Sequence, residues 1–333
     1  MMAAGRAPRT FLLVLLCALA AAAAGARPLR IAFIPKFKNV GQTDALSAYW
    51  QRAWEGAQRA AADLGVDVTL VTADVESQAD ADYVEPQIRL VAGLIASRTV
   101  DGLLIAPFDS NRLAPVVDKA IGAGIPSVAV DTPVNSDRVL ANVVFDNYAA
   151  GKLVGAWVAR RLGGRGKVLV LDGPADQVNA ADRRRGFLAG LQSGDIDVLA
   201  TRSGDWEEEP ARRITAAWLE KFPRVDAIIA ANDTMALGAA QAAREAKRPG
   251  IVITGFDASM DGLLAIARGT IEATVDQAPG DEAGLALRLL VGALRTGARM
   301  PVTASPRGIE LVTRENIGEH LPRVVITRGD PQQ

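Results

Sequence analysis

The stretch AANDTMALGA, residues 230–239, decides the fold, because here an apolar run stops at two polar residues and gives way to a helix. The residues around its start, 226–231, form a short apolar run that is typical of a buried strand. Small residues at helical spacing follow from Met235 onward. One capping side chain is enough to begin a helix. The pair Asn232 and Asp233 therefore raises the question of what the second polar group does at the end of this strand.

The same alternation of strand and helix runs through the rest of the chain. Short apolar runs predict strands over 29–35, 66–72, 102–107, 125–130, 139–144, 167–172, 197–201, 226–231, 251–256, 271–275 and 309–313. Apolar residues at helical spacing predict helices over 50–64, 83–98, 112–122, 147–162, 183–192, 210–222 and 235–247. Fully apolar strands that alternate with helices imply parallel sheets covered on both faces. Two sheets fit this length better than one, so we expect an α/β protein of two similar lobes with a boundary near 144–147.

The N-terminus is predicted to be a secretory signal peptide. Arg6 and Arg9 precede an apolar run over 11–20, and the segment 24–26 fits the small-x-small cleavage pattern. We therefore expect residues 1–26 to be removed and the mature chain to be periplasmic. An uncleaved anchor helix is the alternative, which the shortness of the apolar run disfavours.

Composition and single residues exclude several classes of function. The 37 basic and 38 acidic side chains nearly cancel and form no basic stripe, so no nucleic acid is expected as a partner. The only cysteine, Cys17, lies in the predicted leader, and the only histidine, His320, lies near the C-terminus, where we expect it to be solvated. Catalytic triads and paired-histidine metal sites are thereby excluded, and no dinucleotide or P-loop motif follows a strand. We expect no cofactor, no metal and no catalytic residue.

Polar and aromatic side chains stand where the predicted strands end, which is where parallel sheets bind ligands. These residues are Tyr49, Trp50, Asp131, Arg183, Trp206, Asn232, Asp257 and Gln277. Taken alone, Asp131, Asn232 or Asp257 is more often a helix cap than a ligand contact, and either tryptophan could belong to the core. Together they offer hydrogen-bonding groups for hydroxyls and flat apolar faces, which are the groups that bind a neutral polyol.

An enzyme is the alternative that these residues leave open. Asp131 and Asp257 could act as the two carboxylates of a glycoside hydrolase. That chemistry also needs a proton donor poised by its surroundings, and the sequence gives no sign of one. Binding without turnover is therefore the expectation, and an assay for products would decide the question.

Four motifs in the chain resemble those of a known family, the periplasmic sugar-binding proteins of the ribose-binding type, which feed ABC importers. The motifs are AANDTMALGA (230–239), VITGFDASMDG (252–262), ATVDQAPG (273–280) and RRRGF (183–187). The resemblance extends over residues 29–313. It implies two α/β lobes, each a parallel sheet flanked by helices, joined by a hinge of three crossovers with the ligand cleft between them. On this resemblance the N-terminal lobe is 27–146 plus 277–306 and the C-terminal lobe is 147–276 plus 307–330.

The resemblance also implies a role for each matching residue. Hydroxyl groups of the ligand would be bound by Asp131, Asn232, Asp257 and Gln277. Arg183 would hold a ring or hydroxyl oxygen, and Trp206 would stack on the ligand from the second lobe. Tyr49 and Trp50 stand where the family has an aromatic pair. With Asn232 assigned to the ligand, Asp233 or Thr234 is expected to cap the helix that begins at Met235.

The sequence departs from the family's pattern in two places. The loop over 36–48 is longer than the family's turn before the aromatic pair, so this side of the cleft is reshaped. Thr132 follows Asp131 where ribose binders carry an arginine, which argues against ribose as the ligand. Gln177 and Asn179 precede Arg183 on a predicted loop, which the resemblance to some hexose binders implies adds further contacts, so both are secondary candidates.

The resulting prediction is a monomeric solute-binding protein that captures a monosaccharide or similar polyol and delivers it to the membrane permease of an ABC importer. A sensor of the same fold, which signals to a chemoreceptor or a histidine kinase, is the alternative. A repressor with the same core is not expected, because the chain begins with a leader and no DNA-binding domain precedes residue 29.

Overall fold

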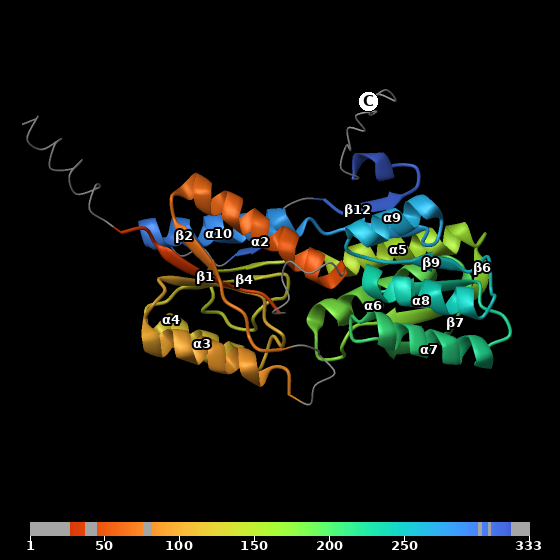
Figure 1. Ribbon diagram of the computed structural model, residues 1–333, viewed down its shortest axis with the longest axis horizontal. Coiled ribbons are helices and arrows are strands. Elements are labelled where there is room, and N and C mark those ends of the chain that lie inside the picture. The colour runs from red at the N-terminus through yellow and green to blue at the C-terminus, as the bar shows by residue number, and fades with distance from the viewer. Residues whose placement is uncertain (1–26, 37–44, 76–81, 299–301, 306–307, 321–333) are drawn as a thin grey trace, which may run out of the picture.

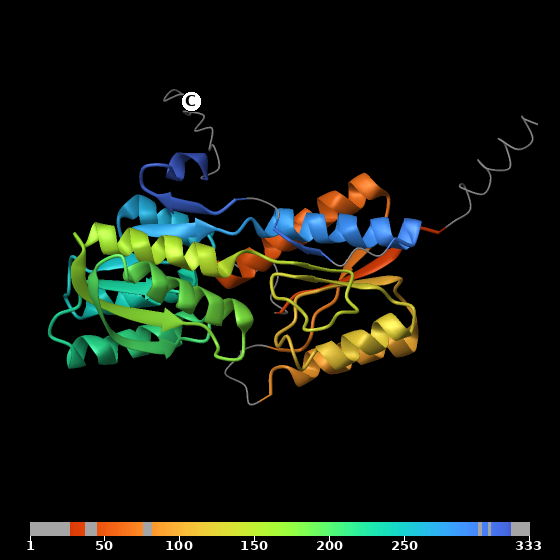
Figure 2. The ribbon, with the colours of Figure 1, turned by 180° about the vertical axis from the view of Figure 1, so that it is seen from behind.

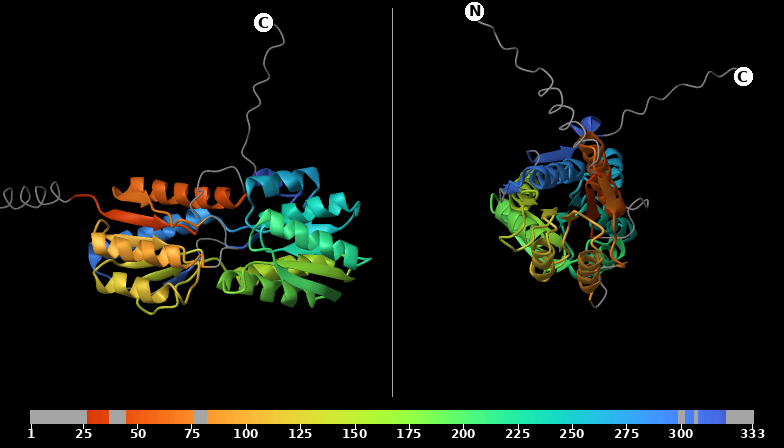
Figure 3. Two further views of the ribbon diagram at one scale, coloured as in Figure 1. Left: turned by 60° about the horizontal axis from the view of Figure 1, so that its bottom comes forward. Right: turned by 90° about the vertical axis from the view of Figure 1, so that its left-hand side faces the viewer.

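The computed structural model describes residues 27–36, 45–75, 82–298, 302–305 and 308–320 (Figure 1). The predicted leader and most of the long loop over 36–48 lie outside these residues. The described chain forms two sheets of six strands, one in each of two bodies that lie end to end (Figure 3). The predicted two-lobed α/β architecture is confirmed.

The first sheet has the strand order β11-β5-β4-β3-β1-β2, and all of its strands are parallel. Its strands are β1 (Arg30–Ile34), β2 (Asp67–Leu70), β3 (Gly102–Ile105), β4 (Ser127–Val130), β5 (Ala141–Val143) and β11 (Val302–Ala304). The helices that cover it are α2 (Ala45–Leu64), α3 (Glu85–Ser97), α4 (Ala114–Gly122) and α10 (Pro279–Thr296). Helices α2 and α10 pack on one face and α3 and α4 on the other (Figure 1). Apolar side chains of the strands and helices form one core.

The second sheet has the strand order β12-β10-β9-β8-β6-β7. Its strands are β6 (Arg165–Asp172), β7 (Asp195–Ser203), β8 (Ala227–Ala230), β9 (Val252–Thr254), β10 (Ala273–Asp276) and β12 (Glu310–Thr313). Its helices are α5 (Asn147–Arg161), α6 (Val178–Leu191), α7 (Glu208–Lys221), α8 (Asp233–Glu245) and α9 (Met260–Arg268), with a 3-10 turn, η1 (Ile317–Glu319), near the end. Helices α5 and α6 cover one face (Figure 2), and α7 and α8 cover the other (Figure 1). A second core lies within these layers.

The chain passes from one sheet to the other three times. The passages join β5 to α5, β10 to α10 and β11 to β12. The carboxyl end of β10, which is followed by Gln277, is therefore also a point where the lobes are connected. Within the described residues, no helix has both the length and the apolar character that crossing a membrane requires.

Several details differ from the sequence predictions. Strand β12 is antiparallel to β10, so the second sheet is not wholly parallel. Strand β11 was missed because a three-residue edge strand carries too little pattern. Helix α6 begins at Val178, so the segment before Arg183 is helix and not the predicted loop. Helix α2 likewise begins before Trp50.

Helices α5 and α6 pack unusually closely because glycines meet across their interface. Each helix carries two glycines four residues apart, Gly151 and Gly155 on α5 and Gly186 and Gly190 on α6. A Cβ placed on Gly151 would lie 2.5 Å from the carbonyl oxygen of Arg183. Since protein interiors are close-packed, this contact fixes the depth at which α6 and its arginine sit.

Candidate ligand-binding site

One pocket between the lobes brings together all nine predicted site residues. The residues that line it are Lys36, Tyr49, Trp50, Asp131, Asn179, Arg183, Trp206, Asn232, Asp257 and Gln277. They come from the ends of β1, β4, β8 and β10, from the turns after β7 and β9, and from the first two turns of α2 and α6. The cavity that remains between them is about 30 Å³, so the side chains nearly fill it in this conformation.

The side-chain amide of Asn232 makes two hydrogen bonds. One of them caps helix α8, so the prediction that Asp233 or Thr234 caps this helix was wrong. Its Oδ1 accepts from the backbone N–H of Met235 at 2.9 Å, which makes Asn232 the N-cap of α8. Its Nδ2 donates to the carbonyl oxygen of Trp206 at 3.1 Å. Helix α8 therefore begins at Asp233, two residues earlier than the pattern suggested.

The carboxylate of Asp233 does not line the pocket and joins the start of α8 to β10 and to the N-cap of α9. One of its oxygens accepts from the N–H and the hydroxyl of Ser259, at 2.8 and 2.9 Å, and the other accepts from Oγ1 of Thr274 at 2.7 Å. Burial raises the pKa of Asp233 to about 6, and these hydrogen bonds oppose the shift. The second polar group of the opening stretch is thus structural: it holds in place the turn that carries Asp257.

Asp131 is not a helix cap but the centre of a buried polar cluster. Its Oδ1 accepts from the hydroxyl of Tyr49 at 2.9 Å. Its Oδ2 accepts from the hydroxyl of Thr132 at 2.7 Å and lies 3.0 Å from the ammonium Nζ of Lys36. Burial favours the neutral acid, but Lys36 and Thr132 outweigh it, so the pKa of Asp131 lies below its ordinary value. The carboxylate is therefore ionised at neutral pH.

Lys36 is a site residue that the sequence reasoning missed. Its ammonium also donates to Oγ1 of Thr132 at 2.8 Å and to Oε1 of Gln177 at 3.1 Å, so all three of its protons have protein acceptors. The lysine brings a positive charge, from the end of β1, to Asp131 and Thr132. A lysine directly after a buried apolar strand was the signal that could have found it.

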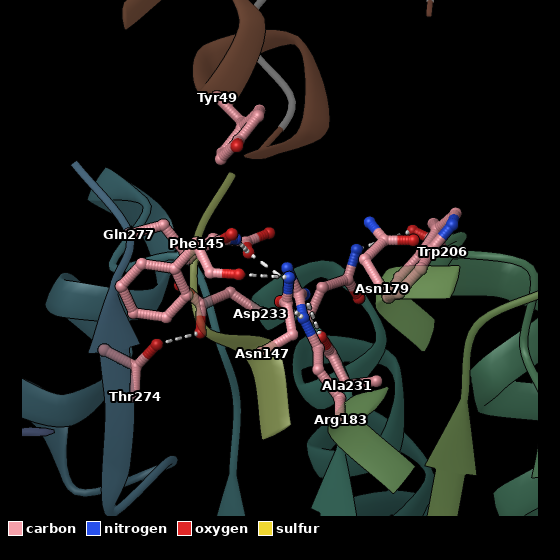
Figure 4. A network of polar contacts seen from close by, with 12 residues as sticks. Tyr49, Phe145, Asn147, Asn179, Arg183, Trp206, Ala231, Asp233, Thr274 and Gln277 are labelled. Atoms are coloured by element: carbon pink, nitrogen blue, oxygen red, sulfur yellow. Dashed lines mark hydrogen bonds and ion pairs between the residues drawn. The ribbon is translucent and has the colours of Figure 1, made fainter. Parts of the chain in front are cut away.

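Arg183 stands in the middle of the network (Figure 4). Its Nε donates to Oδ1 of Asn147 at 2.8 Å, and its Nη1 donates to the carbonyl oxygen of Ala231 at 2.6 Å and lies 3.4 Å from Oδ1 of Asp257. The guanidinium also lies over the ring of Phe256, 3.9 Å from its centroid. These contacts fix the arginine before any ligand arrives, which lowers the entropy lost on binding.

Asp257 and Gln277 form the neighbouring part of the pocket. The side-chain amide of Gln277 donates to Oδ1 of Asp257. Burial raises the pKa of Asp257 to about 7, although Arg183 opposes the shift. Near neutral pH this carboxyl exists in both forms, so it can accept a hydrogen bond from a ligand hydroxyl or donate one to it.

The aromatic residues supply the flat faces of the pocket. The indole N–H of Trp206 donates to Oε1 of Gln177 at 3.0 Å, and a Cβ on Gly173 would lie 2.2 Å from the ring, so the indole rests directly on that backbone. Tyr49 and Trp50 meet edge to face with centroids 5.1 Å apart. The indole N–H of Trp50 is buried and has no hydrogen-bond partner in the described part of the chain.

Asn179, which was predicted to lie on a loop, lines the pocket from the first turn of α6 (Figure 4). Gln177, the other residue predicted to lie on that loop, is the N-cap residue of α6. His320, predicted to be solvated, instead packs between carboxylates, with Nε2 3.1 Å from Glu310 and Nδ1 3.6 Å from Asp276. It lies behind the pocket and not in it. Among the described residues, no group of histidine, cysteine and acidic side chains could hold a metal ion.

Unfavourable backbone conformations gather at this site. Eight non-glycine residues in the described ranges have positive φ. Three of them line the pocket and three adjoin it, namely Asp131 (66°), Trp206 (66°), Asp257 (107°), Asp205 (54°), Ala258 (46°) and Ala278 (51°). Such residues persist where the surrounding structure forces them, and they are typical of ligand sites.

Two α/β lobes that enclose buried hydrogen-bonding groups and aromatic faces define a protein that binds a small ligand in the cleft between its lobes. A family model described as the periplasmic binding protein domain matches residues 40–298. The chain belongs to this family, and the resemblance to its ribose-type sugar-binding members is confirmed.

The known relatives agree with this assignment. The D-ribose/D-allose-binding protein of Pseudomonas aeruginosa is 34% identical over 255 residues, which cover 73% of this chain and 78% of the relative. The xylitol-binding protein of Mycolicibacterium smegmatis is 34% identical over 252 residues, with 74% and 70% covered. Among solved structures, an ABC transporter solute-binding protein from Mycobacterium smegmatis with bound glycerol has a TM-score of 0.76 at 28% identity, covering 88% of this chain and 96% of its own.

Proposed function

We propose that this protein captures a neutral monosaccharide or similar small polyol in the periplasm and delivers it to the membrane permease of an ABC importer. One observation carries the proposal. All nine residues predicted to bind a polyol lie around a single buried pocket between the lobes. The names of its relatives, which bind ribose, allose or xylitol, support the same class of ligand.

The charges of the pocket favour an uncharged ligand. Lys36 is paired with Asp131, and Arg183 lies beside Asp257, so each cation already faces a carboxyl group. An anionic or cationic ligand would have to separate one of these buried pairs, which is strongly unfavourable. A hydroxyl group can instead exchange places with a neutral or charged partner and keep every group hydrogen-bonded.

Capture is proposed to occur by hinged closure of the lobes 27–146 plus 277–306 and 147–276 plus 307–330. The hydroxyl partners would be Asp131, Asn232, Asp257, Gln277 and Asn179, with Arg183 on a ring or hydroxyl oxygen and the three aromatic residues on the apolar faces. Contacts to the second lobe stabilise the closed form only when the ligand fits both lobes. The mature chain would act as a monomer after removal of residues 1–26.

A thermal-shift screen tests the ligand class. The mature chain would be heated with D-ribose, D-allose, other pentoses and hexoses, xylitol, myo-inositol and glycerol, with a sugar acid and an amino sugar as charged comparisons. At least one neutral compound is expected to raise the melting temperature, because a bound ligand adds RT ln(1 + [L]/Kd) to the free energy of unfolding. If no neutral compound does so, or if only charged ones do, the proposed ligand class is wrong.

Uptake and product assays test the role. A strain that lacks this protein is expected to lose high-affinity uptake of the compound found in the screen, and the bound compound should be recovered unchanged after long incubation. Unimpaired uptake with loss of a chemotactic or transcriptional response would support the sensor alternative. Release of a hydrolysed product would show an enzyme.

A further inference from the structure

Arg52, on the first lobe's helix α2, holds two segments of the opposite side of the pocket. Its Nη1 donates to the carbonyl oxygens of Asp257 and Ala258 at 3.2 and 3.0 Å. Its Nη2 lies 2.9 Å from Oδ1 of Asp276. In Figure 1 the N-terminal end of α2 reaches the junction of the two bodies, which is where these contacts form. Arg52 does not itself line the pocket.

The first contact fixes the turn that carries Asp257. Both Asp257 and Ala258 have positive φ, a conformation that costs energy for residues other than glycine. Their N–H groups are bound within their own lobe, to the carbonyl of Val275 at 2.8 Å and to Oγ1 of Thr274 at 3.2 Å. Their carbonyl groups are bound by Arg52, from the other lobe. The guanidinium therefore completes the set of contacts that holds this turn.

The second contact fixes the crossover that carries Gln277. Oδ1 of Asp276, besides meeting Arg52, accepts from the N–H of Ala278 at 2.9 Å. Ala278 has positive φ as well, so the turn around Gln277 depends on this side chain. Gln277 in turn donates to Asp257. One guanidinium thus secures the backbone behind both members of a hydrogen-bonded pair in the pocket.

The exposure of Arg52 indicates how much its ion pair and its hydrogen bonds each contribute. Its side chain is 36% exposed, at a hollow lined by Gln51, Met260 and His320 among others, so the ion pair with Asp276 is partly screened by water. The bonds to the two carbonyl oxygens are charge-assisted and directional, which a lysine cannot reproduce with one ammonium. The geometry, more than the charge, makes the contact specific.

We propose that Arg52 is a positioning residue for ligand binding, which orders Asp257 and Gln277 when the lobes adopt this arrangement. Asp257 and Gln277 then take up their positions in the pocket only when the lobes close. The inference rests on the proposed function for its effect on affinity, but its effect on the backbone is independent of any ligand.

Hydrogen–deuterium exchange and calorimetry on three variants test the inference. Arg52→Met keeps the length of the side chain and removes the donors, Arg52→Lys keeps the charge, and Arg89→Met removes an exposed arginine of α3 that lies 3.7 Å from Glu85 of its own lobe. In the ligand-free protein, Arg52→Met is expected to speed exchange about tenfold in peptides that cover 255–262 and 274–280. It should weaken binding of D-allose or xylitol about tenfold, the loss expected for a charge-assisted hydrogen bond.

The comparison between variants separates positioning from a general loss of stability. Arg52→Lys should recover part of the protection at 274–280, through Asp276, and less at 255–262, while Arg89→Met should match the wild type. Wild-type exchange in both peptides of Arg52→Met would overturn the inference, and so would a uniform rise in exchange across the lobe with unchanged affinity. If the wild type binds neither compound nor any other neutral member of the thermal-shift panel, the ligand assignment fails and the exchange data alone decide the role of Arg52.

Discussion

The ammonium of Lys36 and the side-chain oxygen of Gln177 lie 3.1 Å apart, and they belong to opposite lobes. The same oxygen accepts from the indole N–H of Trp206 at 3.0 Å. Both Lys36 and Gln177 are buried, so this bridge is shielded from water. Together with the hydrogen bond from Tyr83 to Asp176 at 2.6 Å, it joins the lobes through protein groups alone.

Substitution of Gln177 should mainly affect how the lobes are held together, whereas substitution of Lys36 should mainly affect the stability of the protein. Gln177→Ala deletes the oxygen that accepts from Lys36 and Trp206, and it is expected to let the ligand-free lobes separate at a cost of about 1–3 kcal/mol. Lys36→Met leaves the carboxylate of Asp131 buried without its cation, which should lower the free energy of unfolding by about 3–5 kcal/mol. Small-angle scattering of the ligand-free protein measures the first effect and urea denaturation the second.

Lys119→Met provides the control for the lysine, because Lys119 is an exposed residue of α4 in the same lobe. It should match the wild type in both measurements. An unchanged scattering profile for both bridge variants would show that the Lys36–Gln177 contact does not hold the lobes together.

The raised pKa of Asp257 predicts a specific dependence of stability on pH. A carboxyl group whose pKa is raised in the folded state, here from 3.8 to about 7, binds its proton more tightly there than in the unfolded chain. Its contribution to stability is therefore full below about pH 4 and is lost as the pH rises to about 7. Asp257→Asn removes this titration, so its melting temperature should equal that of the wild type near pH 4 and exceed it at pH 8.

The quantity to measure is the difference in melting temperature between variant and wild type from pH 4 to pH 8. Other groups titrate in the opposite sense, since Asp131 has a lowered pKa, and the difference cancels them. The same variant should lose at least tenfold in sugar affinity, because its side chain keeps one acceptor oxygen and places an NH2 donor where the carboxylate has its second acceptor. A difference that stays constant over this pH range would contradict the pKa assigned to Asp257.

Helix packing supplies a prediction about the position of Arg183. A Cβ on Gly151 would lie 2.5 Å from the carbonyl oxygen of Arg183, so Gly151→Ala should push α6 outward. The expected cost is about 1–3 kcal/mol of stability, with weaker ligand binding because the guanidinium moves. Urea denaturation and calorimetry would measure the two effects.

Gly93→Ala is the matched control, since Gly93 lies in α3 and a Cβ there would meet no atom within 4 Å. That change should stabilise the protein by about 0.5–1 kcal/mol, as expected for alanine in place of glycine within a helix. If Gly151→Ala behaved in the same way, the close contact of α5 with α6 would not position the arginine.

The fold and most of the pocket residues could be predicted from the sequence, because the end of each strand is marked by a change from apolar to polar residues. Asp131, Asn232 and Asp257 all stand at such a change, and all three line the pocket. The pattern could not say how Asn232 and Asp233 divide their tasks. That division depends on Ser259, the N-cap residue of α9, and Thr274 of β10, which both donate to Asp233. Arg52 was missed because its partner Asp276 lies 224 positions away in sequence. Lys36 stands just after a predicted strand, but its partner Thr132 lies 96 positions away.

Trp206 provides a further test of the pocket, because its ring is held from two sides. Its indole N–H donates to Gln177, and its face lies against Gly173. Trp206→Ala is expected to remove most of any ligand-induced change in tryptophan fluorescence and to weaken binding of D-allose or xylitol by about 1.5–3 kcal/mol, the value of a buried large apolar side chain. Trp206→Phe keeps an aromatic face but not the donor and should lose less. Gly173→Ala should displace the ring without deleting it, whereas Trp157→Phe, on α5, should retain both signal and affinity. Wild-type affinity in Trp206→Ala would remove this residue from the site.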